Sequence, residues 1–391
     1  MYLERLQLHH FRNYEDVTLT FSPHINVLIG ENAQGKTNLL ESIYTLAMTR
    51  SHRTSNDKEL IQFGTEAAQI KGIIQRTLSP LKIELDIGRH GKKAKVNHLE
   101  KARLSAYLGQ LNVILFAPED LALVKGAPAV RRRFINMELG QISPTYLHNL
   151  SKYRDVLKQR NHYLKLLQTN QATDILYLEV ISDQLANIGA KIAKQRLDFL
   201  VQLEGYMQKL HYEITQNSES LTFKYESALK NLTNTNIDEN TITQQLMALY
   251  TKNRSKEIMQ GITLYGPHRD DVKFLLNGKN VQVYGSQGQQ RTTALAVKLA
   301  EIDLIKAQTG EYPILLLDDV LSELDTKRQT HLLKTIQNKV QTFLTTPALS
   351  GVARDLIKQP KIFQIQNGKV SSSLNSDNKL ETQVFYPSKT K

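Results

Sequence analysis

Eight residues near the N-terminus have the types and spacing that bind the phosphates of a nucleoside triphosphate. Residues 30–37 read Gly-Glu-Asn-Ala-Gln-Gly-Lys-Thr and match the pattern G-x-x-x-x-G-K-[ST]. The glycines let backbone N–H groups approach phosphate oxygens, the lysine neutralises the β- and γ-phosphates, and the threonine hydroxyl is a ligand for Mg²⁺. A glycine turn beside a surface lysine is the simpler alternative. However, the apolar run 25–29 precedes the loop and a helix expected over 36–49 follows it, which is the context that phosphate binding requires. The predicted nucleotide ligands are Gly30, Glu31, Asn32, Ala33, Gln34, Gly35, Lys36 and Thr37.

A second group of residues could hold a metal ion and activate water. The apolar residues 314–317 end in two carboxylates, Asp318 and Asp319. A buried parallel strand that ends in this way places acids where open α/β sheets bind ligands. Paired acids after a strand can also cap a helix, but beside a phosphate loop they favour Mg²⁺ ligation, here by Asp318 together with Thr37. We expect Asp319 to orient the attacking water and to form, with Lys36, the catalytic pair.

Two further segments accompany these groups. Ser286-Gln287-Gly288-Gln289 precedes a helix expected over 292–306, and Ser322-Glu323-Leu324-Asp325 follows the paired acids. The S-x-G-Q pattern is weak alone. It becomes specific when it lies between a phosphate loop and a strand that ends in acids.

The elements that must position these residues are of the α/β type. Alternating apolar residues predict strands over 2–9 and 17–21 before the buried strand 25–29, and further β structure over 66–99. A short buried strand is expected over 111–116. The sequence therefore predicts a mixed sheet around the phosphate loop.

Helical patterning interrupts this domain. One helix is expected over 144–168, and a coiled-coil-like apolar seam runs through 178–199. Residues 231–243, rich in Asn and Thr, are expected to form a linker, and α/β patterning returns after about 255. The expected order is a first part of the nucleotide-binding head over 1–118, a helical arm over 119–250, a second part of the head over 251–370 and a polar tail over 371–391.

The composition indicates the cellular compartment and the class of binding partner to expect. The 391 residues include no cysteine, which excludes a disulfide framework and a cysteine-based zinc site. Because the N-terminus does not resemble a signal peptide and no apolar stretch could span a bilayer, we expect a cytoplasmic protein without a membrane partner. Lys and Arg number 50 against 38 acidic residues, a net charge of +12, which often accompanies a polyanionic partner. Weaker candidates for DNA contact are Lys92, Lys93 and Lys95 near a predicted hairpin tip and Arg131, Arg132 and Arg133, although residues of these types are more often solvated on the surface.

The order of these motifs resembles that in ABC-type ATPase heads of the SMC/Rad50 class. It runs from the phosphate loop through S-x-G-Q and the strand with paired acids to S-x-L-D. A closer match is to the RecF family of bacterial recombination mediators, and it extends over about residues 1–346. The segments that carry it are Phe11-Arg12-Asn13-Tyr14, residues 30–41, Ser51-His52-Arg53, Pro118-Glu119-Asp120-Leu121, Val124-Lys125-Gly126, Arg131-Arg132-Arg133-Phe134 and residues 266–271, 286–291 and 317–325.

This resemblance implies a fold and a function. It implies an ABC-type, SMC/Rad50-like P-loop head interrupted by a helical arm, with ATP and Mg²⁺ as cofactors. It also implies an ATP-dependent homodimer in which Ser286, Gly288 and Gln289 of one copy face the phosphate loop of the other, with Asp325 at the dimer seam. The implied partners are gapped, single- and double-stranded DNA and proteins like RecO and RecR. The implied role is to help load RecA at single-strand gaps, in support of replication restart and the SOS response.

Two departures from the wider ABC pattern favour slow hydrolysis. The second acid is Asp319 where most ABC heads carry Glu, and Thr345-Thr346 stands where many carry a histidine. Both are compatible with a weak, DNA-dependent ATPase that acts as a switch.

Two alternative functions fit parts of the pattern. A transporter ATPase subunit shares the motifs but does not explain the helical insert. A short SMC-like scaffold is expected to have a much longer coiled coil.

Overall fold

The computed structural model describes residues 1–216, 218–230, 232, 237–348 and 356–373, and the chain divides into two compact units. Unit 1 comprises Met1–Asp120 and Glu301–Lys391, and unit 2 comprises Leu121–Ala300. The first boundary lies close to the one expected after residue 118. The second boundary follows Ala300, whereas the sequence predicted a return to the head at residue 251. The difference arises because residues after 251 pack within unit 2, where β10 (Asp271–Leu276) pairs with β9 (Leu221–Glu226).

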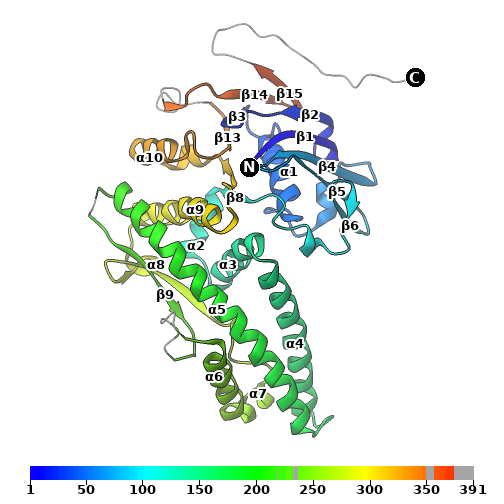
Figure 1. The fold of residues 1–391 in the computed structure, drawn as a ribbon, viewed down its shortest axis with the longest axis vertical. Helices are drawn as coiled ribbons and strands as arrows, with labels where there is room; N and C mark the ends of the chain where they lie inside the picture. Colours follow the sequence, from blue (N-terminus) through cyan, green and yellow to red (C-terminus); the bar gives the residue numbers. More distant parts are fainter. Residues whose placement is uncertain (217, 231, 233–236, 349–355, 374–391) are drawn as a thin grey trace. The chain divides into compact units, whose positions relative to one another are not determined.

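Unit 1 contains the sheet that carries the phosphate loop (Figure 1). Its strand order is β15-β14-β3-β13-β12-β8, and all neighbours are parallel except β14 and β15. Because β3 and β12 flank β13 in parallel, the carboxyl ends of all three strands lie at the same edge of the sheet. The strands are β3 (Ile25–Ile29), β8 (Val113–Phe116), β12 (Ile314–Asp318), β13 (Thr342–Thr346), β14 (Lys361–Gln366) and β15 (Lys369–Ser373).

A second sheet in unit 1 is antiparallel, with the order β2-β1-β4-β5-β6-β7. Helix α1 (Lys36–Met48) contacts strands of both sheets, and most of its residues are buried. The phosphate-loop helix is therefore part of the core. The strands of the second sheet are β1 (Tyr2–Phe11), β2 (Tyr14–Thr20), β4 (Ala67–Gln75), β5 (Leu81–Gly88), β6 (Gly91–Val96) and β7 (Leu99–Glu100), which confirms the predicted hairpin and the β structure over 66–99.

Unit 2 is mainly helical. Helix α4 (Pro144–Gln168) has the predicted bounds, whereas α5 (Ile175–Ile214) is longer than the seam over 178–199. Leu164 and Leu167 of α4 pack against Leu178 of α5, as the seam predicts. Further helices are α2 (Ala122–Lys125), α3 (Pro128–Ile142), α6 (Glu239–Lys252), α7 (Arg254–Gln260) and α8 (Val281–Tyr284), and a three-stranded sheet has the order β11-β10-β9, with β11 at Lys279–Asn280. Helix α9 (Gln287–Thr309) continues from unit 2 into unit 1, and α10 (Thr326–Ile336) belongs to unit 1.

One prediction in this unit is wrong in part. Residues 239–243 are the start of α6 and not a linker, because the Asp238 side chain caps the helix by accepting from the Thr241 N–H at 2.6 Å. Of the remainder of the expected linker, residues 231 and 233–236 lie outside the described residues. The expected tail lies outside them from residue 374 onward, whereas residues 371–373 end β15.

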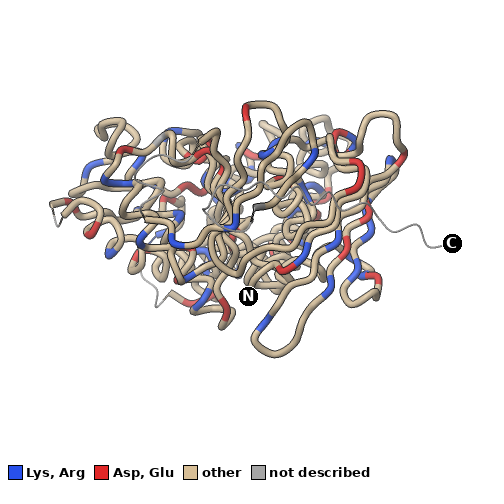
Figure 2. The backbone as a smooth tube through the Cα atoms, turned by 90° about the horizontal axis from the view of Figure 1, so that it is seen from above, with Lys and Arg blue, Asp and Glu red and all other residues tan. Residues whose placement is uncertain are grey.

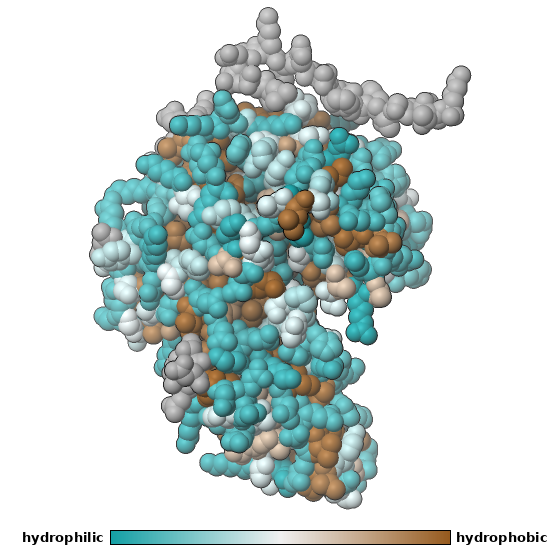
Figure 3. Space-filling model, in the orientation of Figure 1, coloured by the Kyte–Doolittle hydropathy of each residue, from teal (hydrophilic) through white to brown (hydrophobic). Residues whose placement is uncertain are grey.

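The face of the molecule in Figure 3 is largely hydrophilic, and apolar residues appear there as scattered patches among polar ones. Within the described ranges, no helix is both long enough and apolar enough to span a membrane.

Candidate nucleotide-binding site

The predicted phosphate loop connects β3 to α1, and its two glycines are required by their surroundings. A Cβ atom at Gly30 would lie 2.3 Å from the Ile365 carbonyl oxygen. Gly35 has a φ of 117°, and a Cβ atom there would lie 2.8 Å from Asn13 Nδ2. Only glycine fits both positions without displacing a neighbour.

A residue of β2 and a turn near the C-terminal end of the described chain hold the loop. Tyr14 donates from its hydroxyl to the Gly35 carbonyl oxygen at 2.9 Å. On the other side, the turn between β14 and β15 donates from Asn367 N to Gln34 Oε1 at 2.7 Å and from Gly368 N to the Gln34 carbonyl oxygen at 3.1 Å. The loop conformation is thus built into the fold. The sequence patterns did not predict the hairpin that supplies the second turn.

Lys36 is the first residue of α1, and its side chain contacts the phosphate loop that precedes it. Its Nζ donates to the carbonyl oxygens of Gly30 at 2.5 Å and Glu31 at 2.8 Å. Burial lowers the pKa of Lys36, while the nearby charges of Asp319 and Asp318 oppose that shift. The structure therefore brings the loop lysine and the paired acids into one electrostatic environment.

The metal-ligand candidates are in direct contact. Thr37 Oγ1 donates to Asp318 Oδ1 at 3.1 Å. Thr345 on the intervening strand β13 donates from Oγ1 to the same Asp318 oxygen at 2.7 Å. Residues far apart in sequence thus converge at the carboxyl edge of the parallel sheet, as the strand order requires.

Thr345 also positions Asp319. Its Oγ1 accepts from the Asp319 N–H at 2.9 Å, and Asp319 has a φ of 52°. Aspartate tolerates this left-handed conformation better than most residues. The Thr345 hydroxyl therefore holds the side chain of Asp318 and the backbone of Asp319. The sequence did not predict this role.

Replacing Thr345 tests this arrangement. Thr345→Val retains the volume but removes the hydroxyl, which leaves the partly buried Asp319 N–H and one Asp318 oxygen without this partner. We expect a loss of about 1–3 kcal/mol in the free energy of unfolding. The measurement is chemical denaturation, with Thr345→Ser as the control that retains the hydroxyl. Equal stability of all three proteins would contradict the assigned role.

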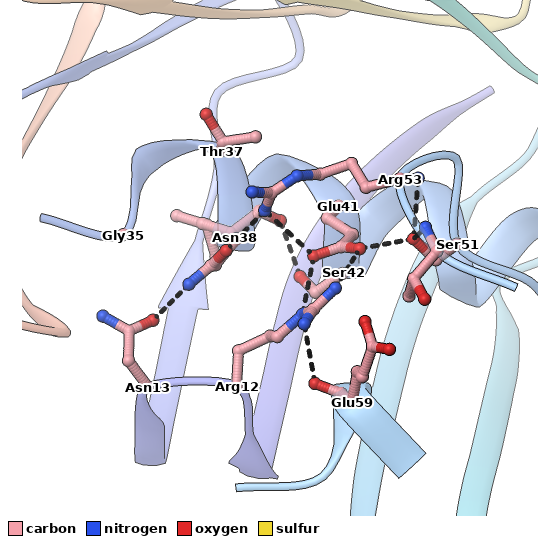
Figure 4. A network of polar contacts seen from close by, with 12 residues as sticks. Arg12, Asn13, Gly35, Thr37, Asn38, Glu41, Ser42, Ser51, Arg53 and Glu59 are labelled. Carbon is pink, nitrogen blue, oxygen red and sulfur yellow. Dashed lines mark hydrogen bonds and ion pairs between the residues drawn. The ribbon is translucent and has the colours of Figure 1, made fainter. Parts of the chain in front are cut away.

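A buried ion-pair network supports α1 from behind the loop (Figure 4). Arg12 donates from Nε and Nη2 to the two carboxylate oxygens of Glu41 at 3.0 and 2.8 Å. Ser51 donates to Glu41 as well, and Arg53 Nη1 lies 3.5 Å from it. Burial alone would raise the pKa of Glu41, but the hydrogen bonds from Arg12 and Ser51 and the charges of Arg12 and Arg53 lower it. The network ties the segments around Arg12 and Arg53 to the phosphate-loop helix.

Ser286 and Gln289 form a capping box at the start of α9. Gln289 N donates to Ser286 Oγ at 3.2 Å, and Ser286 N donates to Gln289 Oε1 at 2.8 Å. The S-x-G-Q segment therefore forms the start of α9, which begins at Gln287 and not at the expected residue 292, and it presents the N-terminal end that favours anions. Ser286 and Gly288 belong to unit 2, whereas Lys36 and Asp318 belong to unit 1.

Asp325 has a local role as well. Its side chain caps α10 by accepting from the Arg328 N–H at 2.9 Å, and it forms an ion pair with the Arg328 side chain. The sequence did not predict this cap. Its expected place at a dimer seam stays a prediction.

Most of the candidate DNA contacts have partners within the chain, and even the exposed Lys93 lies 3.8 Å from a Glu100 carboxylate oxygen. Arg131 is buried and pairs with both carboxylate oxygens of Asp271 at 2.7 and 2.9 Å, so DNA contact by Arg131 is not supported. Lys92 is mostly buried against Asp57 at 2.6 Å. Lys95 pairs with Asp86 at 3.0 Å, and Arg132 donates to the Asp270 carbonyl oxygen at 2.8 Å. Only Lys93 and Arg133 of the six are exposed.

The chain matches the family model described as the RecF/RecN/SMC N terminal domain over residues 2–371. The DNA replication and repair protein RecF of Ligilactobacillus salivarius (strain UCC118) is 67% identical over 371 residues, which cover 95% of this chain and 97% of the relative. RecF of Bacillus subtilis (strain 168) is 54% identical over 368 residues, which cover 94% and 99%.

Solved structures agree with these relatives. The recombination mediator protein RecF-ATPrS of the RecFOR pathway has a TM-score of 0.87 and 35% identity, covering 95% of this chain and 98% of that chain. An SMC head bound to the C-terminal winged-helix domain of ScpA has a TM-score of 0.56 at 16% identity, covering 96% and 98%, which supports the ABC-type head fold alone. The chain therefore belongs to the RecF family, within the RecF/RecN/SMC group of ABC-type ATPase heads.

Proposed function

We propose that this chain is an ATP-dependent DNA-binding mediator of replication and recombinational repair, and that it acts at single-strand gaps. The observation that carries the ATP site is the contact between Thr37 and Asp318 at 3.1 Å, which joins the phosphate loop to the paired acids. Membership of the RecF family supports the repair role.

The donor set at this contact fits Mg²⁺. Among the described residues, no group of three or more His, Cys, Asp or Glu side chains could hold a metal ion by itself. Mg²⁺ in nucleotide sites usually takes one or two protein oxygens and completes its shell with phosphates and water. The Thr37 hydroxyl and the Asp318 carboxylate are such oxygens. When bound, Mg²⁺ would neutralise charge on the β- and γ-phosphates.

Hydrolysis would then depend on positioning. Lys36 would exchange its loop carbonyls for phosphate oxygens, and Asp319 would orient the attacking water. Because the Asp319 carboxylate is one methylene shorter than a glutamate, we expect slow turnover that suits a switch. The Ser286 hydroxyl and the N–H groups at the start of α9 would bind the γ-phosphate of a second copy, which makes ATP the trigger for dimerisation.

The proposed partners follow from this switch. Gapped, single-stranded and double-stranded DNA would bind the ATP-bound dimer, and proteins like RecO and RecR would act with the dimer to load RecA. Because the DNA of a bacterial cell lies in the cytoplasm, we propose that the chain acts there.

The test is DNA affinity with and without ATP at stated salt, together with sedimentation. We expect ATP to convert monomers to dimers and to raise affinity for gapped DNA. A DNA affinity that does not depend on ATP would instead favour the transporter-type alternative.

We propose that one face of α4 binds DNA phosphates. Arg154, Lys158 and Lys165 are exposed and recur at helical spacing along one face of α4. Within the part of the chain that the structure describes, no ion pair engages them, whereas Lys and Arg elsewhere are often interspersed with Asp and Glu (Figure 2). We call these three residues the α4 basic face.

Charge reversal of the α4 basic face should weaken DNA binding and flatten its salt dependence. If each of the three residues neutralises one phosphate, replacement of all three by Glu should reduce the slope of log K against log salt by about 3. The matched control reverses Lys191, Lys209 and Lys252, which are exposed on other helices of unit 2. Equal slopes for the two variants would show that only total charge matters.

A further inference from the structure

The glutamine of the S-x-G-Q segment has a second partner outside its own helix. Gln289 Nε2 donates to Glu219 Oε1 at 2.8 Å. The carbonyl oxygen of the same side chain accepts from Ser286 N at 2.8 Å. A carboxylate only accepts and a backbone N–H only donates, so the two contacts determine which way the amide points. Glu219 and Ser286 together hold the Gln289 side chain in one orientation.

Glu219 lies on the connection between α5 and β9, and that connection is itself anchored. Ser218 Oγ donates to the carbonyl oxygen of Thr215, the residue that ends α5, at 2.7 Å. Ser220 exchanges two hydrogen bonds with Asn277, at 2.9 Å to the side chain and 2.8 Å from the Asn277 N–H. Glu219 is therefore flanked by a side-chain contact to the C-terminal end of α5 and by backbone contacts to the turn between β10 and β11.

The second carboxylate oxygen of Glu219 faces α5. Glu219 Oε2 lies 3.8 Å from Nε2 of His211, a fully buried residue in the last turn of that helix. One carboxylate thus contacts the end of the 40-residue arm helix on one side and the S-x-G-Q segment on the other.

We propose that Glu219 is a positioning residue for the nucleotide site of a second copy, and that it couples the orientation of the S-x-G-Q segment to the end of α5. The inference rests on the proposed function, in which Ser286 and the start of α9 receive a γ-phosphate. Without Glu219, the Gln289 amide can rotate away from Ser286 N, and the donors at the start of α9 lose their fixed arrangement. A displacement of α5 would move Glu219 and so change those donors.

This role differs from that of a fold-stabilising residue. The hydrogen bond from Gln289 N to Ser286 Oγ does not involve the Gln289 amide or Glu219, and the Glu219 side chain is 21% exposed. A negative charge near a helix N-terminus also stabilises the helix. Glu219→Gln separates the two effects, because it removes the charge but retains an oxygen that can accept from Gln289.

The experiment compares full-length wild type with Glu219→Ala and Glu219→Gln. The readouts are ATP affinity of the monomer, ATP-dependent sedimentation, ATPase activity and thermal unfolding. For Glu219→Ala we expect unchanged ATP affinity and a melting temperature equal to that of Glu219→Gln, because both variants remove the charge. The protein concentration needed for ATP-dependent dimerisation should rise about tenfold, since the hydrogen bond that orients the Gln289 amide is lost. Glu219→Gln should dimerise like the wild type.

A double variant sharpens the assignment. If Glu219 acts through Gln289, then Glu219→Ala should have no further effect on dimerisation in a Gln289→Ala background. Additive losses, or dimerisation of Glu219→Ala like that of the wild type, would overturn the inference alone. So would a Glu219→Gln variant as defective as Glu219→Ala. A wild-type chain that stays monomeric with ATP would instead refute the proposed function, and this inference with it.

Discussion

Mixing Lys36→Ala with Ser286→Arg should restore ATP-driven dimerisation that neither variant shows alone. In the proposed dimer, each ATP contacts the phosphate loop of one copy and the S-x-G-Q segment of the other. Lys36→Ala weakens both sites of its own homodimer, and Ser286→Arg places a bulky cation where the γ-phosphate of each opposite copy must dock. A heterodimer contains one doubly damaged site and one intact site, because the intact site pairs Lys36 of one variant with Ser286 of the other.

The expected recovery can be bounded. Since one of two sites is intact, the equimolar mixture should reach at most about half of the wild-type ATPase activity. Sedimentation and ATPase of each variant and of the mixture are the measurements, and Lys36→Ala mixed with Lys36→Ala,Ser286→Arg is the control that contains no intact site. The absence of recovery on both readouts would argue that Lys36 and Ser286 do not meet across two copies.

Asp319→Asn should separate ATP binding from hydrolysis. The amide cannot act as a base or orient water as a carboxylate does, so we expect turnover to fall by about 10²- to 10⁴-fold. Asparagine tolerates the left-handed backbone that Asp319 adopts (φ 52°), and the hydrogen bond from the residue 319 N–H to Thr345 is retained. The variant should therefore bind ATP and remain a dimer with ATP for longer than the wild type.

Asp318→Asn provides the contrast. Its carboxylate accepts from both Thr37 and Thr345, so its loss should reduce Mg²⁺-dependent ATP binding itself. Nucleotide affinity, sedimentation and single-turnover hydrolysis distinguish the two variants. Unchanged hydrolysis in Asp319→Asn would remove Asp319 from the catalytic pair.

The phosphate loop and the paired acids could be predicted from the sequence because their chemistry is local. Residues 30–37 need only a strand before them and a helix after them, and residues 314–319 need only a buried strand that ends in acids. Parallel pairing of β12 with β13, and of β13 with β3, then brings Asp318 to Thr37.

Contacts between distant segments could not be predicted in this way. The Asn367 and Gly368 N–H groups that hold Gln34, and the Glu219 carboxylate that holds Gln289, come from turns whose residue types carry no signal of their partners. The sequence also predicted Arg131 as a candidate DNA contact, because it does not show which acid Arg131 pairs with. Its charge is visible in the sequence, but its ion pair with Asp271 depends on the packing of unit 2.

The place of β3 in its sheet has a consequence for how the protein is made. Its two neighbouring strands, β13 and β14, come from residues 342–346 and 361–366. β3 therefore cannot pair with them until most of the chain has been synthesised. Pairing of segments so far apart in sequence is slow, and an unpaired apolar strand is prone to aggregation in the meantime. A growing chain therefore cannot complete its ATP site on the ribosome until more than 360 residues have emerged, and partial products of translation should neither trap ATP nor dimerise with finished copies.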